Sequence, residues 1–435
     1  MQVVSHRRAV GAVSLEDVTQ LIIRKRWPVT MLGIGPMSED TFIATLELAR
    51  DKDFPVMLIA SRNQIDAAEL GGGYVFCSTQ KNFNAVIRRL SRKVGFRGLL
   101  YLCRDHGGPW QRDNERAAKL PEAKAMDLAK KSYLADILNG FNVLHIDPTK
   151  DPHIPSPIPM EVVIRRTVEL IAFVEKERVR RGIGPVSYEI GTDEISGGLT
   201  AASAFEEFIV TLTRELAAKR LPKPTFIVGQ TGTLVKMRRN MGTTDFKTAR
   251  VLTEIAAKHG IGFKEHNADY LSTECLRRHP KERITASNVA PEYGVAETEA
   301  LVKLARMEEK ALAKASGATR KLRPSGFIAV IQKAVLDSGR WTKWLIKPDP
   351  RLTRERVEAD PKMLEEIMFV NGHYTFNTPE VKSARRTLYA NLVKLGVVKD
   401  PERFVIDYIK KSIDRYVTAF RLKGLTSRVL RELGK

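Results

Sequence analysis

The stretch GLLYLCRDHGGP (98–109) carries the clearest signal of the fold, because a short apolar run ends abruptly in charged residues and glycines. Segments with the periodicity of amphipathic helices, such as 160–181 and 205–220, lie between this run and others like it. Strands that alternate with helices form parallel βαβ units, and eight units are typical of an α/β protein with a (β/α)8 barrel, the TIM-barrel fold. The eight runs are VTMLGIGP (29–36), PVMLIASRNQ (55–64), GLLYLCRDHGGP (98–109), NVLHIDPT (142–149), VSYEIGTDE (186–194), TFIVGQTGT (225–233), IGFKEHNADY (261–270) and RITASNVAP (283–291).

The chain is longer than a barrel requires. It has 435 residues, whereas a barrel of this kind needs about 250. The last apolar run closes near Pro291, and the remaining sequence has helical periodicity. We therefore expect the barrel over 1–300 and a helical C-terminal subdomain, packed on the barrel, over 301–435. One tail helix carries an apolar stripe made of Phe404, Ile406, Ile409, Ile413, Tyr416, Val417 and Phe420.

The composition is strongly basic, with 72 Lys and Arg against 51 Asp and Glu and a formal net charge of +21. These charges are spread along the chain, and no zinc-finger spacing, RNP-type aromatic motif or basic heptad repeat occurs. Nucleic acid is therefore not expected as the main partner. The basic balance indicates a charged, solvated surface with some selection for anionic substrates.

The cellular location is inferred from cysteine usage and hydropathy. Three widely spaced cysteines, with no CxxC pair, indicate a reducing compartment. The first residues lack the apolar core of a signal peptide, and no apolar run approaches the roughly 20 residues of a membrane helix. We expect a cytoplasmic protein with no membrane partner.

The active site of a (β/α)8 barrel lies where its strands end, so the polar residues that close each run are the candidates. Asp105 and His106 follow the third run directly and precede a Gly-Gly-Pro break. A carboxylate beside an imidazole suits a general acid/base next to a metal ligand. The alternative is that Asp105 caps the next helix and His106 packs against Trp110.

The fourth and fifth runs add further candidates. His145 and Asp147 have the same strand parity, so both can point into the barrel mouth. His145 has the alternative of a satisfied core histidine, and Asp147 lies closer to the strand end. Asp193 and Glu194 follow the fifth run as adjacent carboxylates, which can bind a ligand or cap a helix; we favour the ligand for Asp193 and leave Glu194 open.

The seventh run ends in polar residues that include Glu265, His266, Asn267 and Asp269. His266, together with His106, supplies a second imidazole for a metal site. Imidazole and carboxylate ligands suit zinc or a similar divalent ion.

Two small loops at other strand ends are candidates for phosphate contacts through backbone N–H groups. The first contains Gln230 and Thr231, and the second contains Ser287 and Asn288. Simple turn chemistry is the alternative for both. No GxxxxGK[ST] motif occurs, so P-loop kinase chemistry is unsupported.

Several of these motifs together resemble the tagatose-bisphosphate aldolase Z-subunit family. The resemblance runs in the same order over nearly the whole chain and implies a (β/α)8 barrel related to class II, metal-dependent ketose-bisphosphate aldolases. Some members look like stabilising partners of a catalytic aldolase subunit, and others are implicated in C4 epimerisation of tagatose 6-phosphate and fructose 6-phosphate. The motifs are NQ…GGGY (63–64, 71–74), KVGF (93–96), RDHGGPWQ…NE (104–115), HID (145–147), YEIGTDE…GG (188–198), EHNADY (265–270) and GRWTKW (339–344).

The resemblance implies roles for individual residues. Asp105 takes the place of the acid/base carboxylate, and His106 that of a metal-binding histidine. His266 falls where the family has the histidine after the seventh strand. Asp193 falls where the family usually has Glu. The chain departs from the family pattern at GIGPMSED in the first run, at SNVAPEYGVAETEA after the eighth, and at Arg104, which fits an added anion contact.

The sequence thus predicts a metal-dependent enzyme that acts on a phosphorylated or acidic ketose, most simply as a C4 epimerase with aldolase-like chemistry. The alternative is a non-catalytic subunit that stabilises a class II tagatose-bisphosphate aldolase. The expected partners are the ketose and either further copies of the chain or an aldolase catalytic subunit. The expected site comprises catalytic Asp105, Asp147 and Asp193; metal ligands His106, His266, His145 and Glu265, with zinc as the metal; and substrate-binding Asn63, Gln64, Arg104, Gln230, Thr231, Asp269, Ser287 and Asn288.

Overall fold

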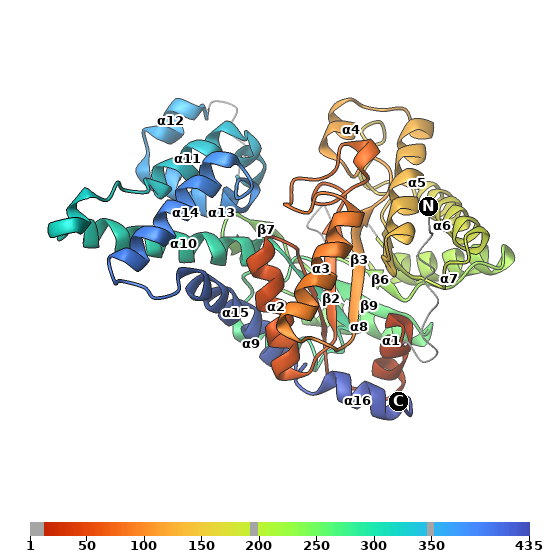
Figure 1. The fold of residues 1–435 in the computed structure, drawn as a ribbon. Coiled ribbons are helices and arrows are strands. Elements are labelled where there is room, and N and C mark those ends of the chain that lie inside the picture. The colour runs from red at the N-terminus through yellow and green to blue at the C-terminus, as the bar shows by residue number, and fades with distance from the viewer. Residues whose placement is uncertain (1–12, 192–198, 346–351) are drawn as a thin grey trace.

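Eight parallel strands form a closed barrel in the computed structural model, which describes residues 13–191, 199–345 and 352–435. The strands follow one another around the barrel in chain order, and β1 closes it by pairing with β10. This arrangement confirms the predicted (β/α)8 barrel (Figure 1). Each strand lies within one of the eight apolar runs: β1 (Met31–Ile34), β2 (Val56–Ser61), β3 (Leu100–Gly107), β4 (Val143–Ile146), β5 (Ser187–Ile190), β6 (Phe226–Val228), β9 (Gly262–Glu265) and β10 (Ala286–Val289).

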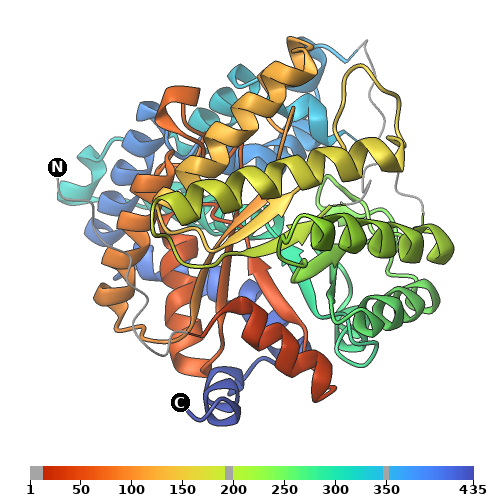
Figure 2. The same ribbon diagram turned by 90° about the vertical axis from the view of Figure 1, so that its right-hand side faces the viewer.

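Helices cover the outside of the barrel, so its strands are buried on both faces, as parallel strands generally are (Figure 2). Side chains next to the helix N-termini cap them with hydrogen bonds. The Ser38 hydroxyl accepts a hydrogen bond from the Thr41 backbone N–H at the start of α2 (Glu39–Lys52), and Thr79 caps α3 (Gln80–Val94) in the same way. The helices up to the last strand are α1 (Leu15–Arg24), α2 (Glu39–Lys52), α3 (Gln80–Val94), α4 (Asp113–Ala117), α5 (Glu122–Leu138), α6 (Met160–Arg180), α7 (Ala202–Ala218), α8 (Phe246–Lys258) and α9 (Thr273–Arg278).

A small antiparallel hairpin interrupts the βα alternation after β6. Its strands are β7 (Val235–Lys236) and β8 (Arg239–Asn240), and they belong to no barrel layer. At the opposite end of the chain, α16 (Leu425–Glu432) lies beside α1 (Figure 1), where Lys25 pairs with Glu432. Segments from the two ends of the described chain therefore lie side by side.

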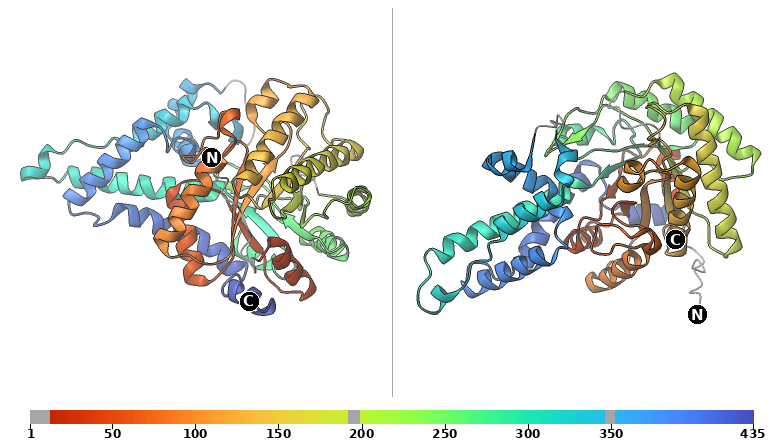
Figure 3. Two further views of the ribbon diagram at one scale, coloured as in Figure 1. Left: turned by 45° about the vertical axis from the view of Figure 1, so that its right-hand side comes forward. Right: turned by 90° about the horizontal axis from the view of Figure 1, so that it is seen from above.

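The tail is helical, as expected, and it packs on the barrel. Helix α10 (Pro291–Leu312) runs from the barrel out into the tail, where α14 (Pro379–Lys394) packs along it (Figure 3). Helix α15 (Pro401–Ala419) returns to the barrel and packs against α2 and α10. Residue 300 lies inside α10, so the division into 1–300 and 301–435 stays a prediction. The other tail helices are α11 (Phe327–Asp337), α12 (Arg354–Glu358), α13 (Pro361–Asn371), α14 (Pro379–Lys394) and α15 (Pro401–Ala419).

The apolar stripe predicted for the last long helix is buried along α15 and at Phe420, the residue that follows it, except for Phe404, which is half-buried. Cys77, Cys103 and Cys275 are buried and free. Across the described residues, every helix is too short or too polar to cross a membrane.

Candidate metal centre in the barrel mouth

An irregularity at the end of β3 brings two consecutive side chains into the barrel. Neighbouring residues of a regular strand point to opposite faces. Here the pairing of β3 with β4 shifts register between Arg104 and Gly107, and His106 adopts a left-handed φ of 42°. Asp105 and His106 consequently line the same cavity. Such a backbone conformation costs about 1–3 kcal/mol in a non-glycine residue and is concentrated at functional sites.

Three imidazoles from three strands meet in the barrel mouth. His106 comes from β3, His145 from β4, and His266 directly follows β9. Their ring centres form a nearly equilateral triangle with sides of 5.2 Å (His106–His145), 5.1 Å (His106–His266) and 5.2 Å (His145–His266). One nitrogen from each ring lies within 4.8 Å of the other two. The cluster joins residues that are 39 to 160 positions apart along the chain.

The triangle has the dimensions of a metal site. Three imidazoles bound about 2.0–2.1 Å from a tetrahedral ion hold their ring centres about 5 Å apart. His145 is fully buried, yet its Nε2 has no hydrogen-bond partner among the described residues, so it is not a satisfied core histidine. His106 keeps 28% of its side chain exposed, which leaves the cluster open on one side. The three residues therefore can hold a metal ion.

Carboxylates hold two of the imidazoles in place. Asp147 Oδ2 lies 2.8 Å from His106 Nδ1, and the other Asp147 oxygen accepts the Thr149 backbone N–H. Glu189 Oε1 lies 2.8 Å from His266 Nε2. Carboxylates behind metal-binding histidines orient the rings and raise their basicity.

The cluster also contains one buried ammonium group. Lys264 Nζ donates to Glu189 Oε2 at 2.6 Å, and Lys264 is only 2% exposed. Asp105 faces the cavity from the other side and accepts a hydrogen bond from Asn288 Nδ2 at 3.1 Å. The barrel mouth therefore holds acids, imidazoles and one lysine in mutual contact.

The acids of the cluster are ionised at neutral pH. Burial by itself raises the pKa of Glu189, but Lys264 and the two neighbouring imidazoles outweigh it and lower the value to about 2. Burial likewise raises the pKa of Asp105, and the three imidazoles bring it well below its usual range. The pKa of Asp147 is also lowered against burial, mainly by its hydrogen bond and charge interaction with His106.

A glycine makes room for His145. A Cβ atom on Gly191 would lie 2.6 Å from His145 Nε2 and 3.1 Å from the Asp147 Cβ. Both distances are shorter than normal van der Waals contact. The residue that follows β5 must therefore lack a side chain for the imidazole to occupy its position.

A cavity of about 350 Å³ is lined by His106 and His266, while His145 lies buried behind them. This volume suits a small molecule, because ligand pockets span about 300–1,000 Å³. The barrel supplies one side of its wall, and the C-terminal tail supplies the other through the 3-10 helices Arg340–Trp344 and Gly372–Tyr374. Tail residues in the wall are Arg340, Lys343, Trp344, His373 and Tyr374.

Four predicted substrate-binding residues line this cavity: Asn63, Gln64, Asp269 and Asn288. The Asn63 amide also ties two loops together, because it donates to the Gln111 carbonyl and accepts from the Asp113 N–H. Asp269 accepts the backbone N–H groups of Ala290 and Glu292, where α10 begins.

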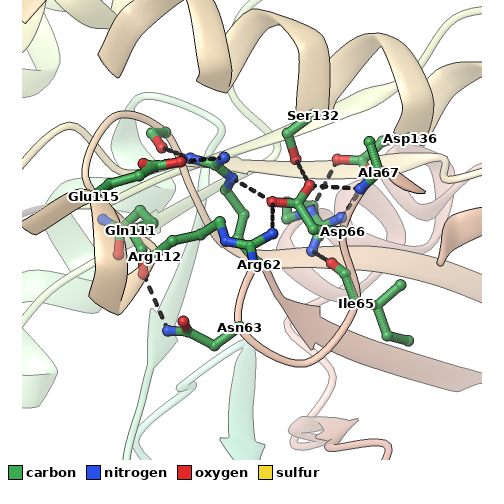
Figure 4. A network of polar contacts seen from close by, with 12 residues as sticks. Arg62, Asn63, Ile65, Asp66, Ala67, Gln111, Arg112, Glu115, Ser132 and Asp136 are labelled. Atoms are coloured by element: carbon green, nitrogen blue, oxygen red, sulfur yellow. Dashed lines mark hydrogen bonds and ion pairs between the residues drawn. The ribbon is translucent and has the colours of Figure 1, made fainter. Parts of the chain in front are cut away.

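Arg104 does not reach the cavity, which corrects the expected anion contact. Its guanidinium is fully buried on the outer side of β3, where it donates to both Asp136 oxygens and to the Ala60 and Ile65 carbonyls. The physical reason is strand alternation: Asp105 points inward, so Arg104 points outward. Figure 4 shows the surrounding network, in which Asp66 and Asp136 lie close together.

Other predicted residues are also held elsewhere by their partners. Glu265 faces away from the imidazoles and bonds His279 Nε2 at 2.5 Å and the Thr244 hydroxyl, because it alternates with Lys264 and His266. The Thr231 hydroxyl donates to Glu265, and the Gln230 side chain accepts the Gly232 N–H. Ser287 is fully buried, and none of these residues lines the cavity among the described residues. Asp193 and Glu194 lie outside the described residues.

Four residues near the site were not predicted. Glu189 had a sequence signal, because a charged residue inside an apolar strand needs a buried partner. Lys264 also had one, since it shares strand parity with His266. Arg340 and His373 come from the tail, and their local sequence does not place them at the barrel.

Comparison with known proteins agrees with this architecture. The D-tagatose-1,6-bisphosphate aldolase subunit GatZ of Escherichia coli (strain SMS-3-5 / SECEC) is 27% identical over 395 residues, covering 86% of each chain. The subunit of the same name from Shigella boydii serotype 18 is 24% identical, also with 86% coverage of each.

Solved structures share the fold. A probable tagatose 6 phosphate kinase from Sinorhizobium meliloti 1021 superposes with a TM-score of 0.70 at 21% identity, covering 90% of this chain and all of that one. The fructuronate-tagaturonate epimerase UxaE from Cohnella laeviribosi has a TM-score of 0.54 at 11% identity and covers 91% of this chain and 82% of its own. Residues 25–423 match the D-tagatose-1,6-bisphosphate aldolase subunit GatZ/KbaZ-like family, and this chain therefore belongs to that family.

Proposed function

We propose that this protein is a metal-dependent enzyme that acts on a ketose phosphate, most simply as a C4 epimerase of the tagatose 6-phosphate/fructose 6-phosphate type. The observation that carries the proposal is the triangle of His106, His145 and His266. Two of its members, His106 and His266, line one small cavity together with Asp105. Clustered titratable groups in a barrel mouth are a usual mark of an active site. Membership of an aldolase-subunit family supports the sugar-phosphate substrate.

The three imidazoles are the proposed ligands of a divalent ion, with zinc favoured by an all-imidazole donor set. When bound, such an ion polarises the oxygens of a ketose. Asp147 and Glu189 keep the His106 and His266 rings in the required orientations through their 2.8 Å contacts. Asp147 is thus proposed as a positioning residue, since both its oxygens are engaged.

Asp105 is the proposed acid/base, because it is the ionised carboxylate of the cluster that lines the cavity. It accepts the proton of the C4 hydroxyl while the C3–C4 bond breaks, and the bonding electron pair passes to the fragment that carries the ketone. The bond then re-forms on the opposite face of the aldehyde, and Asp105 returns the proton. Asn288 donates to Asp105 and fixes the carboxylate in the cavity.

The second candidate is a non-catalytic subunit that stabilises a class II tagatose-bisphosphate aldolase. The observation in its favour is that the curated relatives are described as aldolase subunits. This function requires neither a bound metal nor turnover by the chain alone, and it leaves Asp105 free to change.

The deciding experiment measures conversion of tagatose 6-phosphate to fructose 6-phosphate by the purified chain, with and without a chelator. We expect metal-dependent conversion, and we expect Asp105→Asn to reduce kcat by about 10²–10⁴-fold with an unchanged melting temperature. Asp127→Asn, which alters an exposed carboxylate on α5, is the matched control.

The outcomes separate the candidates. Accumulation of triose products points to net aldol cleavage instead of epimerisation. An inactive, metal-free chain that raises the activity of an aldolase catalytic subunit establishes the second candidate. Wild-type activity in Asp105→Asn removes Asp105 from the acid/base role.

A further inference from the structure

Arg340, from the C-terminal tail, lines the cavity and contacts aromatic rings rather than a carboxylate. The Arg340 guanidinium lies 4.9 Å from the ring centre of Tyr74 and 5.2 Å from that of Tyr374. Among the described residues it has no carboxylate within ion-pair distance and no side-chain hydrogen bond. Aromatic faces attract a guanidinium and orient it, but they leave its N–H donors available.

A lysine from the barrel also lacks an ion-pair partner among the described residues. Lys150 follows β4 and lines the same cavity, and no described residue pairs with its ammonium group. The other two cations of the wall differ, because Lys343 and Arg116 both contact Asp113. Arg116 and Lys343 therefore share the single Asp113 carboxylate as ion-pair partner. Arg340 acts on Asp113, and Lys150 on Asp147, only through charge at longer range, and neither cation forms an ion pair with a described residue.

The charge of Arg340 also affects a buried neighbour in the cavity wall, His373. His373 is 2% exposed, and its Nδ1 has no hydrogen-bond partner among the described residues. Burial, together with the charge of Arg340, lowers the pKa of His373 to about 3. At neutral pH His373 is thus an uncharged polar group beside an unpaired guanidinium.

We propose that Arg340 and Lys150 bind the phosphoryl group of the substrate, so that the C-terminal tail contributes a subsite to the barrel. A planar guanidinium recognises a phosphoryl group through paired N–H donors, and an ammonium group adds a point charge. The cavity of about 350 Å³ accommodates a monosaccharide phosphate between this subsite and the imidazoles. The identity of the ligand as substrate rests on the proposed function, whereas the anion site itself does not.

The test measures binding of inorganic phosphate to the full chain by calorimetry, with acetate as the carboxylate probe. We expect phosphate to bind more tightly than acetate and to raise the melting temperature of the protein. Arg340→Met and Lys150→Met should each weaken phosphate binding by about tenfold or more, as expected for a charged hydrogen bond. The controls are Arg356→Met and Lys124→Met, which remove one positive charge each at exposed positions away from the cavity.

Lys150→Met keeps the test valid if Arg340→Met disturbs the packing of Tyr74 and Tyr374. Phosphate that binds both variants as tightly as the wild type, or no better than acetate, overturns the subsite. Titrations repeated after chelation separate the two proposals. Phosphate binding that survives in a protein with no metal affinity supports the subsite and refutes the metal enzyme, whereas metal binding without phosphate binding refutes the subsite alone.

Discussion

Replacing Gly191 with alanine should loosen the metal centre although no proposed ligand is itself substituted. The new Cβ would lie 2.6 Å from His145 Nε2, whereas ordinary contact begins at 3.4 Å. His145 is fully buried, so relief requires a shift of about 0.8 Å in the ring or in the strand end. Metal–ligand distances tolerate changes of only about 0.2 Å. We expect metal affinity to fall by about 10–100-fold, the range seen when the supports of metal ligands are altered.

The assay is competition between the protein and a chromophoric chelator for zinc, with unfolding by denaturant measured in parallel. Overpacking should also cost about 1–3 kcal/mol of folding free energy. Gly229→Ala is a matched control at the end of β6, because its Cβ would lie 2.8 Å from Phe263 rather than against an imidazole. It should lose similar stability while keeping wild-type zinc affinity. Unchanged zinc affinity in Gly191→Ala, with the expected loss of stability, would refute the reasoning that His145 is a ligand held by this contact.

Two further predictions concern groups around the site. Arg104→Met should destabilise the fold by about 3–5 kcal/mol in denaturant unfolding, because it leaves the buried Asp136 without its ion-pair partner. Arg356→Met should change stability little. Wild-type stability of Arg104→Met with a raised KM would instead restore Arg104 as a substrate contact. Burial, and then the charge of Glu292, raises the pKa of Asp269 from 3.8 to about 7. Between these two pH values the native state keeps a proton that the unfolded state has lost, so the free energy of unfolding falls as the pH rises from the lower value to the higher one. Asp269→Asn should therefore gain stability relative to the wild type between pH 5 and pH 7, on the order of 2 kcal/mol, and a difference that is constant with pH would show that this carboxyl does not titrate there.

Much of the fold was predictable because it depends on local pattern. Each barrel strand coincides with a run of apolar residues that ends in polar ones, and the intervening helices follow from the 3.6-residue periodicity. The alternation of strands and helices restricts the topology to parallel units. The helical tail was predictable for the same reason, since the apolar stripe of α15 is a property of one segment.

The site was predictable only in part. His106, His145 and His266 each lie at a strand end, so barrel closure alone brings them to one rim. The direction of each side chain was harder to infer. Arg104 and Glu265 were expected inside the site, but strand alternation points both away from the cavity.

The sequence by itself determined the number of barrel units and the rim residues available for chemistry, because hydrophobic periodicity and strand ends are local properties. Only the tertiary structure decided which of those residues meet. The register shift in β3 turns His106 toward the same cavity as Asp105, and Gly191 leaves the space that His145 occupies. The fold of the tail over the barrel brings Arg340 to the cavity wall. These arrangements arise from contacts between residues far apart in the chain. Strand pairing and side-chain packing select them, and no single segment encodes them.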